Sequence, residues 1–181
     1  METGNGLTYH QQVFHAKTKT RDMAIVSLFL GTGIRVSELV GLNLSDMDFT
    51  NDNFVVTRKG GNRVILYLNP EVKQFVMEYY DIRKDNANVP VGENALFLNL
   101  SNKRLSTRAV ENIIKKYSKI ASPLKKITPH KLRSTFGTEL YRSTGDIYIV
   151  ADVLGHKDVN TTKKHYAAVT EDIRKKAAQY V

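Results

Sequence analysis

The residues best suited to chemistry lie in three separated stretches of this 181-residue chain: GTGIRVSEL at 31–39, HKLRSTF at 130–136 and LGHKDVNTTKKHY at 154–166. They contain arginines, histidines and a tyrosine. Planar guanidinium groups make bidentate contacts to phosphate oxygens, which a lysine does not match. A tyrosine hydroxyl becomes a nucleophile when its proton is accepted. If the fold brings these stretches together, the residue types suit chemistry on a phosphate.

Two pairs within these stretches have helical spacing. His130 and Arg133 are three residues apart, so on a helix they share a face and can reach the same anion. The alternative for His130 is a histidine at a helix start with a satisfied hydrogen bond. Arg35 and Glu38 have the same spacing, and the alternative for them is a surface ion pair of a few tenths of a kcal/mol.

Tyr166 ends the third stretch. A tyrosine with the reference pKa of about 10 is mostly neutral at pH 7, so it needs a proton acceptor and nearby cations that favour its anion. The arginines, lysines and histidines could supply both. The alternative is a tyrosine that packs on the core with its hydroxyl in water. His165 precedes it and has the same chemistry as His156, but neighbouring helical residues face different ways, so we assign His165 no catalytic role.

Composition limits the class of protein. The 27 Lys and Arg exceed the 18 Asp and Glu, and the net charge of +9 favours a polyanionic partner such as nucleic acid, although an anionic membrane would match the same sign. No apolar run approaches the roughly 20 residues of a membrane span, and no signal peptide is visible. We therefore expect a cytoplasmic protein. The absence of cysteine excludes a thiol nucleophile, and the five histidines show no metal-ligand spacing.

The elements that must position these residues follow from periodicity and turn residues. Apolar periodicity predicts a helix over 20–30, ended by the glycines of GTG, and a short helix in IRVSELVGL. The run FVVTRKGGNRVILYL predicts a β-hairpin around Gly60, Gly61 and Asn62, with Lys59 where the turn begins.

Capping residues predict the later helices. Asn69 with Pro70, Ser106, Thr128 with Pro129, and Asp146 each precede a helical pattern. The expected helices run from these caps to about Arg83, Ile120, Tyr141 and Leu154, the last ended by Gly155, and a final one begins at Thr170. The sequence thus predicts a mainly α domain with a small antiparallel β-sheet, of the α+β class.

The order and spacing of the three stretches resemble the tyrosine recombinases, also called phage-type integrases, over nearly the whole chain. The family pattern TG-hydrophobic-R-x-S-E matches residues 32–38. The resemblance implies the tyrosine recombinase catalytic-domain fold, with Arg35 as the first phosphate clamp. It also implies that Glu38 braces the site without reacting.

The remaining roles come from the same resemblance. His130 and Arg133 match the family's His-x-x-Arg helix, His156 matches the histidine of its LGH segment, and Tyr166 matches its nucleophile. Tyr166 follows His156 by ten residues, one more than in many members of the family. Lys59 corresponds to the hairpin lysine, a general acid for the leaving oxygen; the alternative is a lysine that keeps the turn soluble.

The activity implied by the resemblance is site-specific DNA recombination or integration, as in phages and mobile elements. Double-stranded DNA would be cleaved and rejoined through a 3′-phosphotyrosyl intermediate, without metal or other cofactor and without a membrane partner. Two alternatives are a type IB topoisomerase, which rejoins the same strand, and a DNA-binding regulator that has lost catalysis. The longer match to TGIRVSEL and LGHKDVNTT favours a recombinase.

The expected organisation is a single catalytic domain over 1–181, with an N-terminal extension at 1–17 and a C-terminal tail helix at 170–181. Family members usually carry a further N-terminal DNA-binding domain, which we expect to be absent here, so the chain is expected to be a catalytic fragment. The resemblance implies a homotetramer on DNA for the full-length protein, associated with the nucleoid. The tail either docks on a neighbouring subunit or folds back on its own domain.

Overall fold

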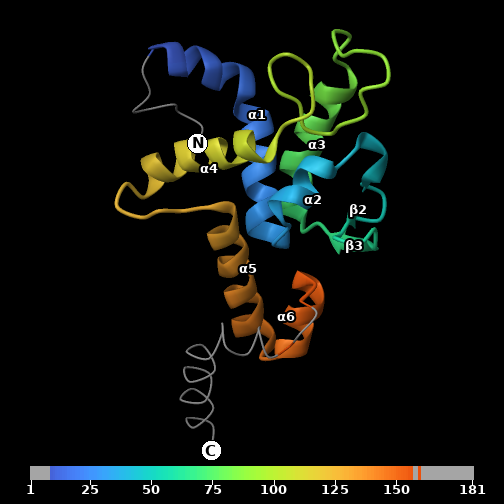
Figure 1. Cartoon of the computed structure of the whole chain (residues 1–181), viewed down its shortest axis with the longest axis vertical. Coiled ribbons are helices and arrows are strands. Elements are labelled where there is room, and N and C mark those ends of the chain that lie inside the picture. Colours follow the sequence, from blue (N-terminus) through green and yellow to red (C-terminus); the bar gives the residue numbers. More distant parts are fainter. Residues whose placement is uncertain (1–8, 157–158, 160–181) are drawn as a thin grey trace, which may run out of the picture.

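The computed structural model describes residues 9–156 and 159, with side chains from residue 15 onward. In this part of the chain the fold is mainly helical, as the sequence predicts, and one small sheet lies at its edge beside α2 (Figure 1). The elements are α1 Tyr9–Thr32, α2 Val36–Gly41, a 3-10 turn Leu44–Asp46, β1 Met47–Asp48, β2 Asn53–Thr57, β3 Arg63–Tyr67, α3 Pro70–Lys84, α4 Thr107–Ala121, α5 Pro129–Thr144 and α6 Ile147–Leu154.

The first helix differs from its predicted boundary. α1 begins at Tyr9, whereas the apolar pattern predicts a start at Thr20, so residues 9–17 of the expected extension continue the helix. The helix ends as predicted at the GTG stretch, where Gly33 has φ +62°. A positive φ suits glycine because it has no Cβ, and a Cβ here would also lie 2.5 Å from the Phe136 ring.

A buried polar network explains why periodicity misses the start of α1. His15, Thr18 and Asp22 are 6%, 7% and 1% exposed, so residues 15–22 of α1 bury polar rather than apolar side chains. Tyr117 of α4 donates to Asp22 at 3.0 Å, and its Oη lies 3.1 Å from Nδ1 of His15. Burial, followed by the Asp22 charge, raises the pKa of Tyr117 well above its usual value, so this hydroxyl stays protonated and donates.

The sheet is antiparallel with strand order β1-β2-β3. The register pairs Phe54 with Leu66 and Val56 with Val64, and both β2 side chains are buried. Alternation along β2 leaves Thr57 exposed. Residues 58–62 form the predicted turn; the two-residue β1 was not predicted.

Caps begin the later helices as the sequence predicts. Asn69, Ser106 and Thr128 each accept a hydrogen bond from the backbone amide three residues later, at 2.8, 3.2 and 3.2 Å. Asp146 caps α6, and Gly155 ends it in the left-handed conformation. The first and last residues of α6 follow from these two local signals.

The main core lies around α1, which packs on α3 and α5 (Figure 1). Full burial of one Val, Leu, Ile or Phe side chain stabilises the fold by about 1.5–3 kcal/mol. The largest fully buried side chains of this core are Ile25, Leu28, Phe29, Ile34, Leu39, Leu42, Phe54, Val56, Val76, Leu96 and Phe97.

A second, smaller cluster joins α5 to α6. Tyr141, Val150 and Leu154 are buried in it, with Phe136 packed against them. A Cβ added at Gly33 would approach both Phe136 and Leu154, so the end of α1 lies against this cluster. The packing therefore holds the C-terminal end of α6 beside the start of α2.

Candidate active site

Arg35 and Glu38 meet at the start of α2. Glu38 is 5% exposed and accepts from the Arg35 backbone amide at 2.9 Å and from its Nη1 at 2.7 Å. The first bond caps the helix, and the second holds the guanidinium. Because the Arg35 side chain is 35% exposed, the ion pair is anchored in the protein while one side of the arginine faces outward. Because Glu38 is buried, the Arg35–Glu38 pair differs from the solvent-exposed ion pair that the sequence left as the alternative.

Arg133 lies on the inner face of α5, which also buries Gly137 and Tyr141 at intervals of one turn. The residue is 7% exposed, and its guanidinium donates to the backbone carbonyls of Gly33 and Leu154. A buried charge is costly unless it is hydrogen-bonded. These carbonyls thus fix Arg133 at the junction of α1, α5 and α6.

The two arginines meet at the C-terminal end of α6. Arg35 Nη2 donates to the Leu154 carbonyl at 3.1 Å and to the Gly155 carbonyl at 3.0 Å, and Arg133 donates to Leu154 as well. The last carbonyls of a helix lack intrahelical partners and carry partial negative charge. α6 has no basic residue in its own last turn, so arginines from distant segments take that place.

A third arginine joins them. Arg58, at the start of the hairpin turn, donates from Nη2 to the Val153 carbonyl at 2.9 Å, and its Nε lies 3.9 Å from Glu38 Oε1. Arg58 is not among the site residues predicted from the sequence. Strand alternation was a signal that could have identified it, because Phe54, Val56 and Arg58 fall on the same inward face.

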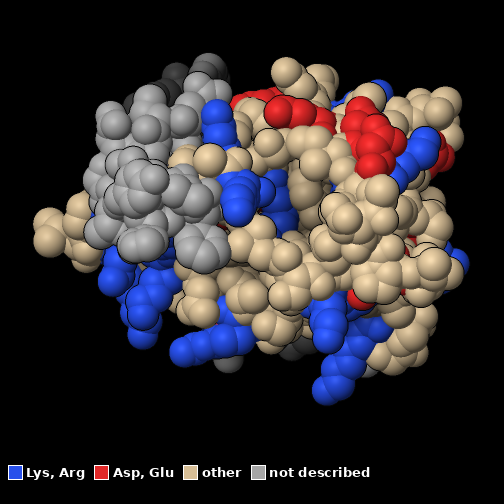
Figure 2. Space-filling model, turned by 90° about the horizontal axis from the view of Figure 1, so that it is seen from above, with Lys and Arg blue, Asp and Glu red and all other residues tan. Residues whose placement is uncertain are grey.

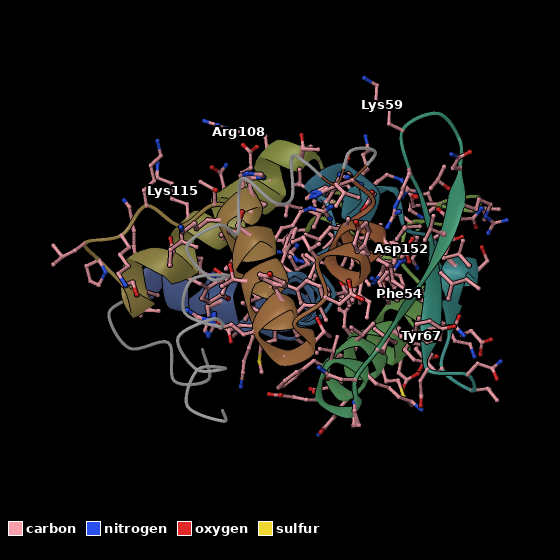
Figure 3. All side chains as sticks on the ribbon, turned by 90° about the horizontal axis from the view of Figure 1, so that it is seen from below. Phe54, Lys59, Tyr67, Arg108, Lys115 and Asp152 are labelled. Carbon is pink, nitrogen blue, oxygen red and sulfur yellow. The ribbon has the colours of Figure 1, made fainter. Side chains whose placement is uncertain are left out.

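The other predicted residues are more exposed. His156 is half-buried just after α6, and its backbone amide donates to Ala151 at 2.9 Å. His130 lies exposed in the first turn of α5. Lys59 is exposed in the turn between β2 and β3, and its side chain points away from the body of the protein (Figure 3). The structure therefore brings Arg35, Glu38 and Arg133 together, with Lys59 and His130 at the surface.

Tyr166, His165 and the tail at 170–181 lie outside the described residues. Within residues 9–156, no helix is long and apolar enough to cross a membrane. In the same part of the chain, no three His, Asp or Glu side chains form a group that could hold a metal ion.

Basic side chains continue beyond the arginine cluster. Figure 2 shows the molecule from above. On this face Lys and Arg lie near the centre and along the lower edge, and Asp and Glu lie mainly along the upper edge. A groove between α4 and the loop that follows it is lined by five basic side chains and one acidic one, Glu111. The basic ones are Arg108, Lys115, Lys119, Lys125 and Lys126. Such a surface suits a polyanion.

Comparisons with known proteins show which family the chain belongs to. The model of the phage integrase family matches residues 8–172. Tyrosine recombinase XerC of Thermodesulfovibrio yellowstonii is 38% identical over 149 residues, covering 81% of this chain and 50% of the relative. Tyrosine recombinase XerS of Streptococcus agalactiae is 35% identical over 179 residues, covering 97% and 49%. The chain thus spans about half the length of these curated relatives.

Solved structures show the same fold. The crystal structure of XerA recombinase has a TM-score of 0.79 at 31% identity, covering 96% of this chain and 64% of that one. XerH recombinase bound to a palindromic difH substrate has a TM-score of 0.77 at 22% identity, covering 91% and 47%. With the family match over most of its length, the chain belongs to the phage integrase family and has the tyrosine recombinase catalytic-domain fold.

Proposed function

We propose that this chain is the catalytic domain of a site-specific tyrosine recombinase, which cleaves and rejoins double-stranded DNA through a 3′-phosphotyrosyl bond at Tyr166. The observation that most supports this is the meeting of Arg35 and Arg133 on the Leu154 carbonyl. Two guanidiniums held this close together offer several donors to one phosphate. The family match and the similarity to tyrosine recombinases also support this function.

The proposed reaction begins with in-line attack of the Tyr166 hydroxyl on the scissile phosphorus. Arg35, Arg133 and His156 stabilise charge on the non-bridging oxygens, and His130 assists proton movement or holds the phosphate. Lys59 gives a proton to the departing 5′-oxygen. A 5′-hydroxyl of another strand then attacks the phosphotyrosine and restores the DNA backbone.

Fixed cations take the role of electrostatic catalysts in this proposal. The buried carboxylate of Glu38 holds the Arg35 guanidinium in place. Little solvent therefore has to reorganise when negative charge develops on the phosphate. The basic groove and the exposed Lys59 supply phosphate contacts for the flanking duplex; Figure 3 shows Lys59, Arg108 and Lys115 extending from the same side of the molecule. DNA recognition by XerH and by the Tn1549 transposon integrase supports DNA as the partner here.

The wider organisation is proposed on the same basis. The chain would act as a single catalytic domain, and the full-length protein would form a homotetramer on DNA in the cytoplasm. The tail at 170–181 would link neighbouring subunits, and its deletion would then reduce synapsis more than binding to a single site.

The test is a suicide substrate, a duplex with a nick beside the scissile phosphate, so that cleavage traps the covalent complex. We expect the full-length protein to form the adduct and to transfer the trapped strand to a second duplex. The Tyr166→Phe variant should form no adduct while binding DNA normally. Tyr67→Phe is the matched control, because Tyr67 is 70% exposed on β3. Adduct formation by Tyr166→Phe contradicts the proposal, and rejoining of the original strand alone favours a topoisomerase.

A further inference from the structure

Arg58 is a largely buried arginine directly beside Lys59. Its side chain is 16% exposed and reaches from the hairpin to α6, where Nη2 donates to the Val153 carbonyl at 2.9 Å. A Cβ added at Gly155 would overlap the guanidinium, so Gly155 also lies against it. The arginine therefore occupies the space between the hairpin and the segment that leads to His156.

The backbone of Arg58 also closes the hairpin turn. Its amide donates to the Asn62 carbonyl at 2.8 Å, and its carbonyl accepts from the Gly61 amide at 3.0 Å. The rest of the turn stands clear of the body, because a Cβ at Gly60 or Gly61 would meet nothing within 4 Å. Within the described structure, the Arg58 side chain is thus a tether between this turn and the arginine cluster.

The tether also reaches the carboxylate behind Arg35. Arg58 Nε is buried without a hydrogen-bond partner among the described residues, and it lies 3.9 Å from Glu38 Oε1. The same oxygen accepts from Arg35 at 2.7 Å. One carboxylate is therefore shared by an arginine proposed to bind phosphate and by the arginine that precedes Lys59.

We infer that Arg58 is a positioning residue, which sets the place of Lys59 relative to Arg35 and the α6 end. The inference rests on the proposed function. In the cleavage step His130 accepts the proton of the Tyr166 hydroxyl, the bond from the Tyr166 oxygen to phosphorus forms, and the bond from phosphorus to the 5′-oxygen breaks. The Lys59 ammonium transfers a proton to that oxygen and becomes an amine. Proton transfer needs a hydrogen-bonding distance, so an untethered turn slows this step.

A substrate with sulfur in place of the bridging 5′-oxygen isolates this role. The thiolate is a stable leaving group and departs without a proton, so cleavage no longer needs the general acid. A defect that acts through Lys59 should disappear on the sulfur substrate. A defect in phosphate binding or in the fold should remain on both substrates.

Three variants of the full-length protein are compared on both substrates by the rate of covalent adduct formation. Arg58→Met removes the donors and keeps the stem, Lys59→Met removes the general acid, and Arg63→Met is the matched control. Arg63 lies on the same hairpin but is exposed and pairs with Asp46 at 3.5 Å. We expect Lys59→Met to lose about 10²–10⁴-fold on the oxygen substrate, and Arg58→Met about 10–10²-fold through misplacement.

On the sulfur substrate Arg58→Met and Lys59→Met should both cleave at the wild-type rate. For Arg63→Met, the ratio of the oxygen-substrate rate to the sulfur-substrate rate should equal that of the wild type. If Lys59→Met is rescued but Arg58→Met stays slow, the inference is overturned while the proposed function stands. If Lys59→Met is not rescued, Lys59 is not the general acid and the proposed function itself needs correction. A wild-type rate for Arg58→Met on the oxygen substrate also overturns the inference.

A second variant covers the case in which Arg58→Met does not fold, as judged by thermal unfolding. Arg58→Lys keeps the charge but carries one ammonium, which does not reach both Val153 and Glu38 as a guanidinium does. Its oxygen-substrate rate should fall by about tenfold and should recover with sulfur. An equal defect on both substrates counts against the inference.

Discussion

Glu38 gives the sharpest link between the stability of the fold and the arrangement of the site. Its carboxylate accepts from the Arg35 amide and from the Arg35 guanidinium, and it faces Arg58 Nε at 3.9 Å. Glu38→Ala removes all three interactions at a nearly fully buried position. Glu38→Gln keeps an acceptor of similar shape and removes only the charge.

The expected loss follows from these contacts. The bond that caps α2 contributes about 1 kcal/mol. A charge-assisted bond contributes about 1.5–3 kcal/mol when protected, but Arg35 is one-third exposed, so solvent screening reduces it to about 1 kcal/mol. The Arg58 contact adds little net, because desolvation offsets most of its attraction. Glu38→Ala should therefore destabilise the fold by about 2 kcal/mol, and Glu38→Gln by roughly half as much.

Thermal and urea unfolding measure these losses. For a domain of this size about 2–4 °C is lost per kcal/mol, so Glu38→Ala should melt about 4–8 °C lower. Glu78→Ala is the matched control, since Glu78 is exposed on α3 and should change stability by less than about 0.5 kcal/mol. Both Glu38 variants should lose cleavage more than DNA binding, because Arg35 is misplaced rather than removed. A Glu38→Ala protein with wild-type melting and wild-type cleavage would refute the reasoning.

Three further predictions use other parts of the structure. Arg133→Lys should slow adduct formation on the suicide substrate by about 10²-fold or more, because one ammonium does not replace a guanidinium that bridges two carbonyls; a wild-type rate would contradict this. Cleavage should be unchanged by EDTA, since side-chain cations stabilise the charge, and inhibition reversed by Mg²⁺ would contradict it. Tyr117 has a raised pKa in the folded state, so its stabilising contribution is complete below about pH 10, its unfolded pKa, and falls as the pH rises above that value. Tyr117→Phe should cost about 1 kcal/mol near neutral pH and lessen the alkaline loss in urea unfolding; parallel losses in both proteins would show that Tyr117 is not responsible.

The elements that are set by local chemistry could be predicted from the sequence. Asn69, Ser106 and Thr128 begin helices because a side-chain oxygen accepts an amide bond within the same turn. Such signals need no knowledge of the rest of the fold. The start of α1 was missed because His15 and Thr18 are buried in a polar network with Tyr117 and Asp22, which apolar periodicity does not register.

The site was predictable only where a motif carried it. Arg35 and Arg133 could be paired through the resemblance, but their shared acceptor, the Leu154 carbonyl, follows from tertiary packing of α6. Arg58 is next to Lys59 in the sequence, and the alternation of strand residues would have placed its side chain on the buried face of the hairpin. Its contact with Val153 depends on where α6 lies, which no local pattern determines.

The identity of the nucleophile tests the central claim most directly. Wild-type protein is trapped on the suicide substrate, the DNA and the protein are digested, and the cross-linked peptide is sequenced by mass spectrometry. We expect a single adduct in which Tyr166 is joined to the 3′-phosphate of the cleaved strand, formed equally well in EDTA. An adduct on another residue, a 5′-phosphate linkage, or cleavage with no covalent adduct would contradict it.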